Sequence, residues 1–308
     1  MIFLLHVIML IRPLNALIVF AALIVVRLVL QSEYATLNLT PHITQTDYLL
    51  MIVTGMLILG SGNVVNDIID QEIDRINKPG KAIIPEKVTS LQAWILYSMM
   101  NLAAVLLSAY LAARYGVLQY LSLPVGAILL LYVYSRYLKK RFFWGNFAIA
   151  FLCASLPLAG FLVESSNVEL IRSNDPDVYR LIAYQVICMM SFSFILVLNR
   201  ELVKDCEDVD GDSRVGADTM PIRLGNEYCR KIMLGYFILY ALVFSTLNYQ
   251  RYLLQPGSLL MIATVVFLVV YAFGIIYAWR KYEGKKFYSV MSALIKLYLI
   301  IGLLFMLI

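Results

Sequence analysis

Nine apolar segments, each long enough to cross a membrane, dominate this chain of 308 residues. A membrane-spanning helix needs roughly 20 apolar residues. The segments are centred on residues 14–30, 48–66, 91–113, 117–135, 144–163, 180–199, 231–248, 257–279 and 288–308. Hydrophobic residues make up 61% of the chain, against about 45–50% in soluble domains. We expect an all-α, polytopic membrane protein in which nine transmembrane helices form one bundle around a central cavity. Residues 1–308 would be a single domain, with loops over the polar stretches 67–90 and 200–229.

Basic residues gather in alternate loops between these segments. The loops after the second, fourth, sixth and eighth segments hold 18 of the 25 Lys and Arg residues. Such loops face the cytoplasm in membrane proteins. We therefore expect a multi-pass protein of the cell membrane, with a cytoplasmic N-terminus and an external C-terminus. Arg27, near the outer end of the first segment, is expected to anchor that helix at the membrane interface.

The first acidic stretch, "NVVNDIIDQEIDRINKPGK" at residues 63–81, directly follows the second apolar segment. If that helix continues through residue 74, successive side chains turn by about 100°. Glu72 and Arg75 then point away from the other polar side chains. Five side chains fall within an arc of about 100°: Asn63, Asn66, Asp67, Asp70 and Asp74. This spacing would line one wall of a cavity with oxygen ligands.

The second acidic stretch, "NRELVKDCEDVDGDSRVGADTMPIRLG" at residues 199–225, follows the sixth segment. On a helix, Asp205, Asp208 and Asp212 lie within about 60° of one another. Both stretches belong to loops that are predicted to be cytoplasmic, so their site would open to the cytoplasm. Two walls of carboxylates repel each other unless cations bridge them. Oxygen ligands without His or Cys suit Mg²⁺.

Basic side chains lie near both acidic stretches and in the loop after the fourth segment. Together with Mg²⁺ they would bind a diphosphate and stabilise it as a leaving group. The side chains predicted to bind the diphosphate are Lys78, Lys81, Arg136, Lys139, Lys140, Lys204 and Arg214.

Both acidic stretches resemble signatures of the UbiA superfamily of intramembrane prenyltransferases. "NDIIDQEIDRINKP" is similar to its NDxxDxxxD motif, "EDVDGD" to its DxxxD motif, and "IRPLN" to a common R-P-x-N stretch. The resemblance implies a prenyl diphosphate donor that is bound through Mg²⁺. The metal would be held by Asn66, Asp70, Asp74, Asp208 and Asp212, with Asp67 and Asp205 as accessory ligands. The four aspartates Asp70, Asp74, Asp208 and Asp212 are the expected catalytic residues.

Ionisation of such a donor leaves an allylic cation, which a nucleophile of the acceptor captures. The second stretch most resembles the branch of the superfamily that adds a geranylgeranyl group to the hydroxyl of geranylgeranylglyceryl phosphate. We expect that acceptor, with an aromatic acceptor of quinone biosynthesis as the alternative. Arg12, Asn15 and Asn63 are expected to contact the acceptor head group. Positive-inside topology for Arg12 and helix packing for Asn15 are the alternative readings.

A transporter or divalent-cation channel is the alternative from another functional class. Transporters bind their substrates near the bilayer midplane, whereas the acids here gather at one mouth. Apart from Lys296, the deep parts of the apolar segments carry almost no charge. Lys296 would either face a functional site or extend to the interface. The transferase reading implies a prenyl diphosphate, a lipophilic acceptor and membrane lipid as partners, with no nucleic acid and no obligate protein partner.

Overall fold

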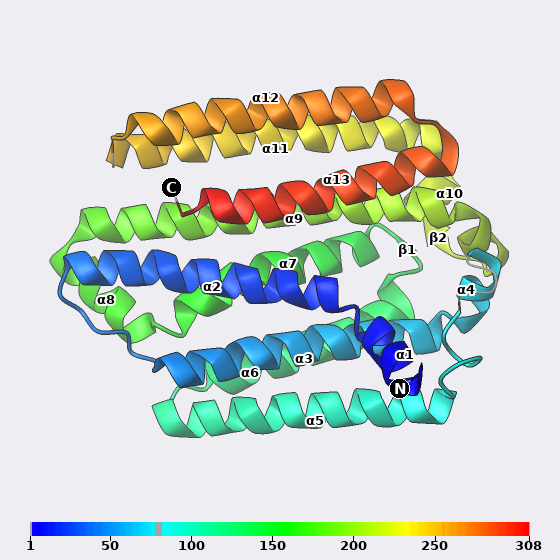
Figure 1. The fold of residues 1–308 in the computed structure, drawn as a ribbon, viewed down its shortest axis with the longest axis horizontal. Helices are drawn as coiled ribbons and strands as arrows, with labels where there is room; N and C mark the ends of the chain where they lie inside the picture. Colours follow the sequence, from blue (N-terminus) through cyan, green and yellow to red (C-terminus); the bar gives the residue numbers. More distant parts are fainter. Residues whose placement is uncertain (1, 78–81, 255, 308) are drawn as a thin grey trace. The chain divides into compact units, whose positions relative to one another are not determined.

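The computed structural model describes residues 2–77, 82–254 and 256–307. Helices dominate these residues, which confirms the all-α class (Figure 1). Nine of the helices described are long and apolar enough to cross a membrane, as predicted. They are α2 (Pro13–Thr36), α3 (Gln45–Ile69), α5 (Ser90–Tyr115), α6 (Gln119–Val133) with the π-helical η1 (Tyr134–Leu138), α7 (Trp144–Leu162), α9 (Pro176–Arg214), α11 (Asn226–Leu254), α12 (Ser258–Lys281) and α13 (Gly284–Phe305).

The two polar stretches are more regular than the predicted loops. The helix α9 is 39 residues long, about 58 Å at 1.5 Å per residue, which is nearly twice the thickness of a bilayer core. Its last part carries residues 199–214 of the second acidic stretch as helix rather than as loop. The remaining elements are α1 (Ile2–Ile11), α4 (Gln71–Asn77), α8 (Ser165–Asn174), α10 (Met220–Leu224), β1 (Arg141–Phe142) and β2 (Asp218–Thr219).

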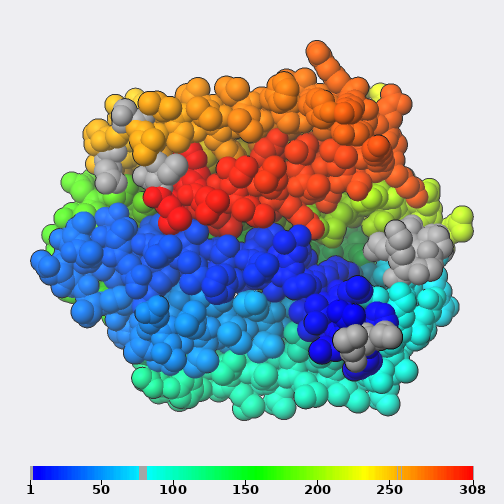
Figure 2. Space-filling view, viewed as in Figure 1, coloured from blue at the N-terminus to red at the C-terminus, as the bar shows by residue number. Residues whose placement is uncertain are grey.

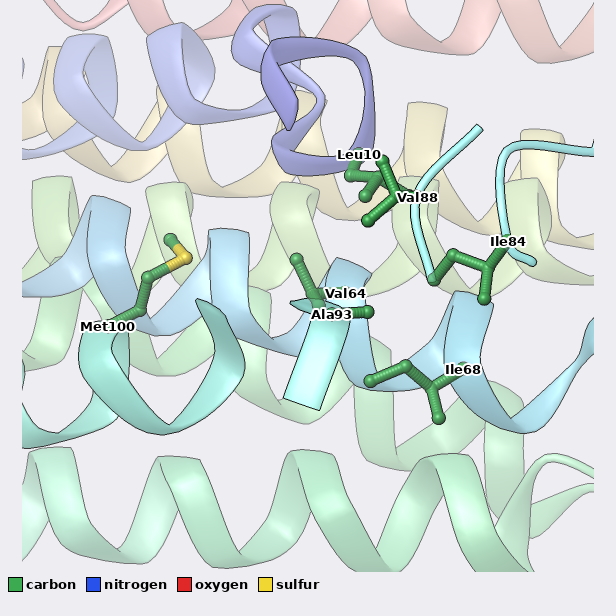
Figure 3. Packing of buried hydrophobic residues seen from close by; sticks show 7 residues of the cluster. All are labelled: Leu10, Val64, Ile68, Ile84, Val88, Ala93 and Met100. Carbon is green, nitrogen blue, oxygen red and sulfur yellow. The ribbon is translucent and has the colours of Figure 1, made fainter. Parts of the chain in front are cut away.

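The chain forms two compact units that alternate along the sequence. Unit 1 comprises Met1–Leu23, Ile43–Ala148 and Asp210–Thr219; unit 2 comprises Ile24–His42, Ile149–Val209 and Met220–Ile308. In unit 1, α3 packs against α1, α5 and α6. An apolar cluster around the second half of α3 holds its acidic end in place (Figure 3). The buried members of this cluster are Leu10, Val64, Ile68, Ile84, Val88, Ala93 and Met100.

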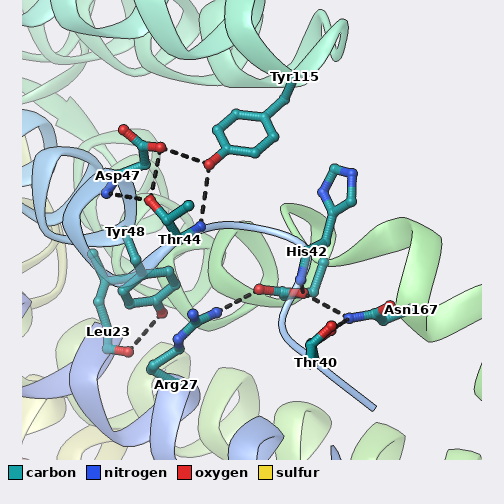
Figure 4. A network of polar contacts seen from close by, with 10 residues as sticks. Leu23, Arg27, Thr40, His42, Thr44, Asp47, Tyr48, Tyr115 and Asn167 are labelled. Atoms are coloured by element: carbon teal, nitrogen blue, oxygen red, sulfur yellow. Dashed lines mark hydrogen bonds and ion pairs between the residues drawn. The ribbon is translucent and has the colours of Figure 1, made fainter.

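The N-terminus of α3, far from its acidic end, is capped by a side chain. The Thr44 hydroxyl accepts a hydrogen bond from the Asp47 backbone N–H (3.2 Å) and caps the first turn (Figure 4). The Tyr115 hydroxyl donates to Asp47 Oδ2 at 2.6 Å, and Arg114 Nε lies 3.0 Å from the same oxygen. These contacts fix where α3 starts, about seven turns before its acidic end.

Unit 2 contains an aromatic core where α11, α12 and α13 pack together. The Tyr271 ring lies 4.7 Å from the Tyr298 ring and 4.9 Å from the Tyr240 ring, centroid to centroid. The neighbouring α12 and α13 are visible side by side in Figure 2. The outer side of α12 exposes large apolar side chains, as expected of a helix that contacts lipid. They include Leu259, Ile262, Val265, Val266, Val269, Val270 and Phe273.

Arg27 does not anchor its helix at the membrane interface, so that expectation is wrong. Within unit 2 its side chain is buried and forms an ion pair with Glu164, which is also fully buried. Glu164 Oε2 also accepts a hydrogen bond from the His42 backbone N–H at 2.7 Å. A charge is tolerated at such a depth when an opposite charge and hydrogen bonds compensate it.

Candidate metal and diphosphate site

The first acidic stretch is divided between two helices, and the break lies at Asp70. The ψ angle of Asp70 is 11°, far from the value of about −42° in an α-helix, so α3 ends and α4 begins at Gln71. The expectation of one unbroken helix through residue 74 is therefore wrong. Backbone hydrogen bonding nevertheless bridges the break. The Asp70 backbone N–H donates to the Asn66 carbonyl oxygen at 2.9 Å. The Asp74 backbone N–H donates to the Asp70 carbonyl oxygen at 2.8 Å.

The Asp70 carboxylate is buried, with 2% of the residue exposed. Its Oδ2 accepts hydrogen bonds from Asn66 Nδ2 (2.8 Å) and from Lys139 Nζ. Its Oδ1 and the Asn66 Oδ1 have no hydrogen-bond partner among the residues that the structure describes. A buried acceptor without a partner costs about 1–3 kcal/mol. These two oxygens are therefore suited to bind a cation.

Lys139 connects the two acidic stretches electrostatically. Burial alone would lower the pKa of Lys139, but its ion pair and hydrogen bond with Asp70 raise the pKa above the ordinary 10.5. The charges of Asp212 and Asp74 raise it further. The ammonium group is therefore charged at neutral pH. Asp212 belongs to the second stretch, so both stretches act on one lysine within unit 1.

The position of Lys139 depends on a close approach between two backbone segments, at Gly145 and at residues 138–139. A Cβ atom on Gly145 would lie 2.9 Å from both the Leu138 carbonyl oxygen and the Lys139 Cα. Only glycine permits the start of α7 to pack this tightly against residues 138–139. Lys139 also directly follows the π-helical turn η1, and such turns are frequent at functional sites.

A two-stranded parallel pairing brings the end of the second stretch to the same loop. Arg141 of β1 pairs with Asp218 of β2, and the Asp218 N–H donates to the Lys140 carbonyl at 2.9 Å. The strand β2 begins four residues after α9 ends, so this pairing ties the end of α9 to the lysine loop. The sequence gives no sign of this pairing, because a strand of two residues has no detectable periodicity.

A second polar cluster in unit 1 joins α1, α2 and α3. Arg12 lies between α1 and α2 with φ = 56°, directly before Pro13. Its Nη2 lies 2.5 Å from Asp67 Oδ1, and its Nη1 donates to Asn63 Oδ1 at 3.4 Å. Asn63 Nδ2 in turn donates to the Ile11 carbonyl at 3.1 Å. Arg12 thus contacts both Asn63, another residue predicted to bind the acceptor, and Asp67, a predicted accessory metal ligand.

The other predicted residues are distributed over both units. In unit 1, Asn15 lies in the first turn of α2, Arg136 in η1, Lys140 before β1 and Arg214 at the end of α9. In unit 2, Lys204, Asp205 and Asp208 lie on α9, and Lys296 lies on α13. Because α9 is helical through Arg214, its three aspartates keep their common face, within about 60°. Lys78 and Lys81 lie outside the residues described.

The donor atoms fit Mg²⁺. Residues 2–77, 82–254 and 256–307 contain no group of three or more His, Cys, Asp or Glu side chains already arranged around a metal position. The unpaired oxygens of Asn66 and Asp70 are nevertheless amide and carboxylate ligands of the kind that Mg²⁺ prefers. Asp74 and Asp212 supply further carboxylates near Lys139. A cation there would also offset the negative charge that one lysine leaves uncompensated.

Comparisons with known proteins agree with this chemistry. A model of the UbiA prenyltransferase family matches residues 34–300. The digeranylgeranylglyceryl phosphate synthase of Pyrococcus abyssi is 35% identical over 169 residues, which are 54% of this chain and 52% of that protein. The chain thus spans about half the length of that relative. The synthase of the same name from Methanosphaera stadtmanae is 26% identical over 263 residues, 85% of this chain and 84% of that one.

Solved structures share the fold. A structure of a digeranylgeranylglyceryl phosphate synthase in membranes has a TM-score of 0.64 at 24% identity, with 99% of this chain and 98% of that chain covered. A UbiA homolog from Archaeoglobus fulgidus, bound to GPP and Mg²⁺, has a TM-score of 0.62 at 14% identity, with 98% and 100% covered. At these identities the likeness establishes the fold.

Proposed function

Since this chain belongs to the UbiA prenyltransferase family, we propose that it transfers a geranylgeranyl group from geranylgeranyl diphosphate to the hydroxyl of geranylgeranylglyceryl phosphate. Two relatives that carry the name of such a synthase support this choice of substrates. The UbiA homolog that binds GPP and Mg²⁺ supports a prenyl diphosphate donor and a divalent metal. The chain is a multi-pass membrane protein, and the distribution of its basic residues favours a site that opens to the cytoplasm.

One observation carries the proposal. Lys139 is paired with Asp70 and interacts electrostatically with Asp74 and Asp212, so one cation interacts with carboxylates from each acidic stretch. Beside it, Asn66 and Asp70 each hold a buried oxygen that no described residue hydrogen-bonds. A site with carboxylates for a metal and an ammonium group for a phosphate oxygen is what a diphosphate leaving group requires.

Each group then has a definite task in the reaction. Asn66, Asp70, Asp74 and Asp212 would hold Mg²⁺, with Asp205 and Asp208 as further predicted ligands. Bound Mg²⁺ would neutralise charge on the diphosphate as the bond to the prenyl carbon breaks. Lys139 would donate a hydrogen bond to a diphosphate oxygen, at a partly buried position where charge interactions are stronger than in water. Arg12, Asn15 and Asn63 remain proposed contacts of the acceptor.

A pair of variants in the first stretch tests the site. Asp70→Asn removes the charge of the buried carboxylate and should lower the transfer rate by at least about 100-fold, the scale of a lost electrostatic contact at a reacting centre. Glu72→Gln is the matched control, because Glu72 belongs to the same stretch but is exposed on α4. Rates would be measured with purified protein in detergent, with Mg²⁺ and labelled geranylgeranyl diphosphate. Equal activity of Asp70→Asn and wild type would refute the assignment.

The same assay decides the acceptor. Geranylgeranylglyceryl phosphate and a hydroxybenzoate- or naphthoate-type acid would be offered in separate reactions. We expect labelled product with the glyceryl phosphate. Product with the aromatic acid alone would overturn the proposed acceptor and keep the proposed metal site. Absence of product with either acceptor, together with normal binding of the donor, would overturn the proposed transfer.

A further inference from the structure

On α9, Arg200 and Glu201 are not among the residues of the metal and diphosphate site described above. Arg200 Nη1 donates to Glu201 Oε1 at 2.8 Å, and Lys204 Nζ lies 3.5 Å from the same oxygen. The side chains of Arg200 and Glu201 are 15% and 8% exposed. All three residues belong to unit 2. A carboxylate buried at this level usually has either a structural or a chemical task.

The helical register aligns Glu201 with the second acidic stretch. Glu201, Asp205, Asp208 and Asp212 are spaced by four, three and four residues on one continuous helix. At about 100° per residue, their side chains lie within an arc of about 60°. Glu201 is the first of the four along α9 and directly follows the apolar segment 180–199. It lies about 6 Å before Asp205 and about 10 Å before Asp208 along the helix axis.

Arg200 retains a donor that no described residue uses. Its Nε is buried and has no hydrogen-bond partner in the part of the chain that the structure describes. A guanidinium group carries five N–H donors in a planar fork that matches a phosphate or a carboxylate. The contact with Glu201 uses one of them. This buried donor is available to an anionic ligand beside Glu201.

We propose that Arg200 and Glu201 form the acceptor end of the active site, an inference that rests on the proposed function. Arg200 binds the phosphate of the acceptor, and Glu201 accepts the proton of the acceptor hydroxyl. A glyceryl phosphate carries its free hydroxyl only a few bonds from its phosphate. Neighbouring side chains on one helix can therefore contact both groups.

The proton transfer balances without any further reactant. The bond between the prenyl carbon and the diphosphate oxygen breaks, and its electron pair leaves with the diphosphate. A lone pair of the acceptor oxygen then forms the new ether bond. The oxygen becomes a positively charged oxonium, a strong acid that a carboxylate readily deprotonates. The hydroxyl proton passes to Glu201, which later releases it to water.

Substitution of Glu201 should separate transfer from donor binding. General-base catalysis contributes about 10²–10⁴-fold, so Glu201→Gln should lower kcat by at least about 100-fold. Affinity for a thiolodiphosphate analogue of the donor should change less than about twofold, because that analogue binds at the metal. Formate should restore at least about tenfold activity to Glu201→Ala, since it replaces the missing carboxylate. Glu169→Gln, an exposed substitution on α8, should behave as wild type.

Substitution of Arg200 should affect acceptor binding. Arg200→Gln should raise KM for geranylgeranylglyceryl phosphate at least about tenfold, because it removes a charged contact with the phosphate. KM for the corresponding alcohol without phosphate should stay unchanged. If a single variant does not fold, Arg200→Gln/Glu201→Gln removes both charges of the pair and should show the same loss of rate.

Three results would overturn this inference. They are an unchanged kcat in Glu201→Gln, a parallel loss of donor binding, and no response of Glu201→Ala to formate. The last two would mean that Glu201 has a structural role. A wild-type enzyme that forms no product with any acceptor would contradict the proposed function instead. The two failures are thus distinguishable.

Discussion

At the scale of single residues, the two carboxylate oxygens of Asp70 differ in their hydrogen bonding. Its Oδ2 accepts hydrogen bonds from Asn66 and Lys139, whereas its Oδ1 is buried without a partner among the residues described. The lysine compensates the charge of the carboxylate, and the unpaired oxygen remains available as a ligand. One side chain can therefore bind a metal without leaving its lysine.

Removing Lys139 should impair use of the diphosphate donor. Lys139→Met leaves the buried Asp70 carboxylate without its cation and removes the proposed donor to a diphosphate oxygen. We expect kcat/KM for the donor to fall about 10²–10³-fold, the usual loss for one such contact. Steady-state kinetics with labelled donor measure this. Lys87→Met, at an exposed position in the same part of unit 1, should change the value less than about twofold. Similar values for the two variants would remove Lys139 from the site.

At the scale of elements, the site depends on backbones that approach closely. The loop from η1 to β1 is held on one side by the start of α7, where Gly145 touches residues 138–139. On another side, the hydrogen bond from Asp218 to Lys140 ties the loop to β2. The position of the lysine is therefore set by the packing of short elements and by its own contact with Asp70.

A methyl group at Gly145 should displace this loop. Gly145→Ala places a carbon 2.9 Å from backbone atoms that have little freedom to move. We expect a loss of about 1–3 kcal/mol in stability from overpacking, together with a higher KM for the donor. Gly126→Ala is the control, because a Cβ there meets nothing within 4 Å and improves helix propensity by about 1 kcal/mol. Thermal unfolding in detergent compares the two, and equal Tm values would show that the contact at Gly145 is unimportant.

At the scale of the whole molecule, each unit has an apolar interior and exposes further apolar side chains. This arrangement suits lipid as the surrounding solvent, because backbone groups are satisfied within helices and the outer faces need no polar residues. The nine candidate spans in the described residues and the alternation of basic loops predict one topology, which we propose for this chain. In that topology both acidic stretches are on the cytoplasmic side.

Labelling of single added cysteines tests the topology. Lys87→Cys lies in a loop that is predicted to face the cytoplasm, and Glu169→Cys lies on the exposed α8, predicted to be external. A maleimide that does not cross membranes should label Glu169→Cys on intact cells, and Lys87→Cys only after permeabilisation. Wild-type protein provides the background from the four native cysteines. The reverse pattern would invert the proposed orientation and move the site to the outside.

The sequence by itself determined the features that depend on local chemistry. Nine apolar segments predict nine spans because each helix satisfies its own backbone in lipid. The spacing of Asp205, Asp208 and Asp212 predicts a common face because their helix is continuous. At Asp70 the backbone departs from ideal helix geometry, so the ideal spacing predicts too long a helix there.

Only the tertiary structure decided which distant groups meet. Asp70 and Lys139 are 69 residues apart, and Arg27 and Glu164 are 137 residues apart. No periodicity in the sequence relates such positions. Their partners are chosen when helices pack, because a buried charge requires an opposite charge at the same depth. For this reason the sequence could name only candidate ligands and candidate lysines, while packing decided that Lys139 is the lysine paired with Asp70.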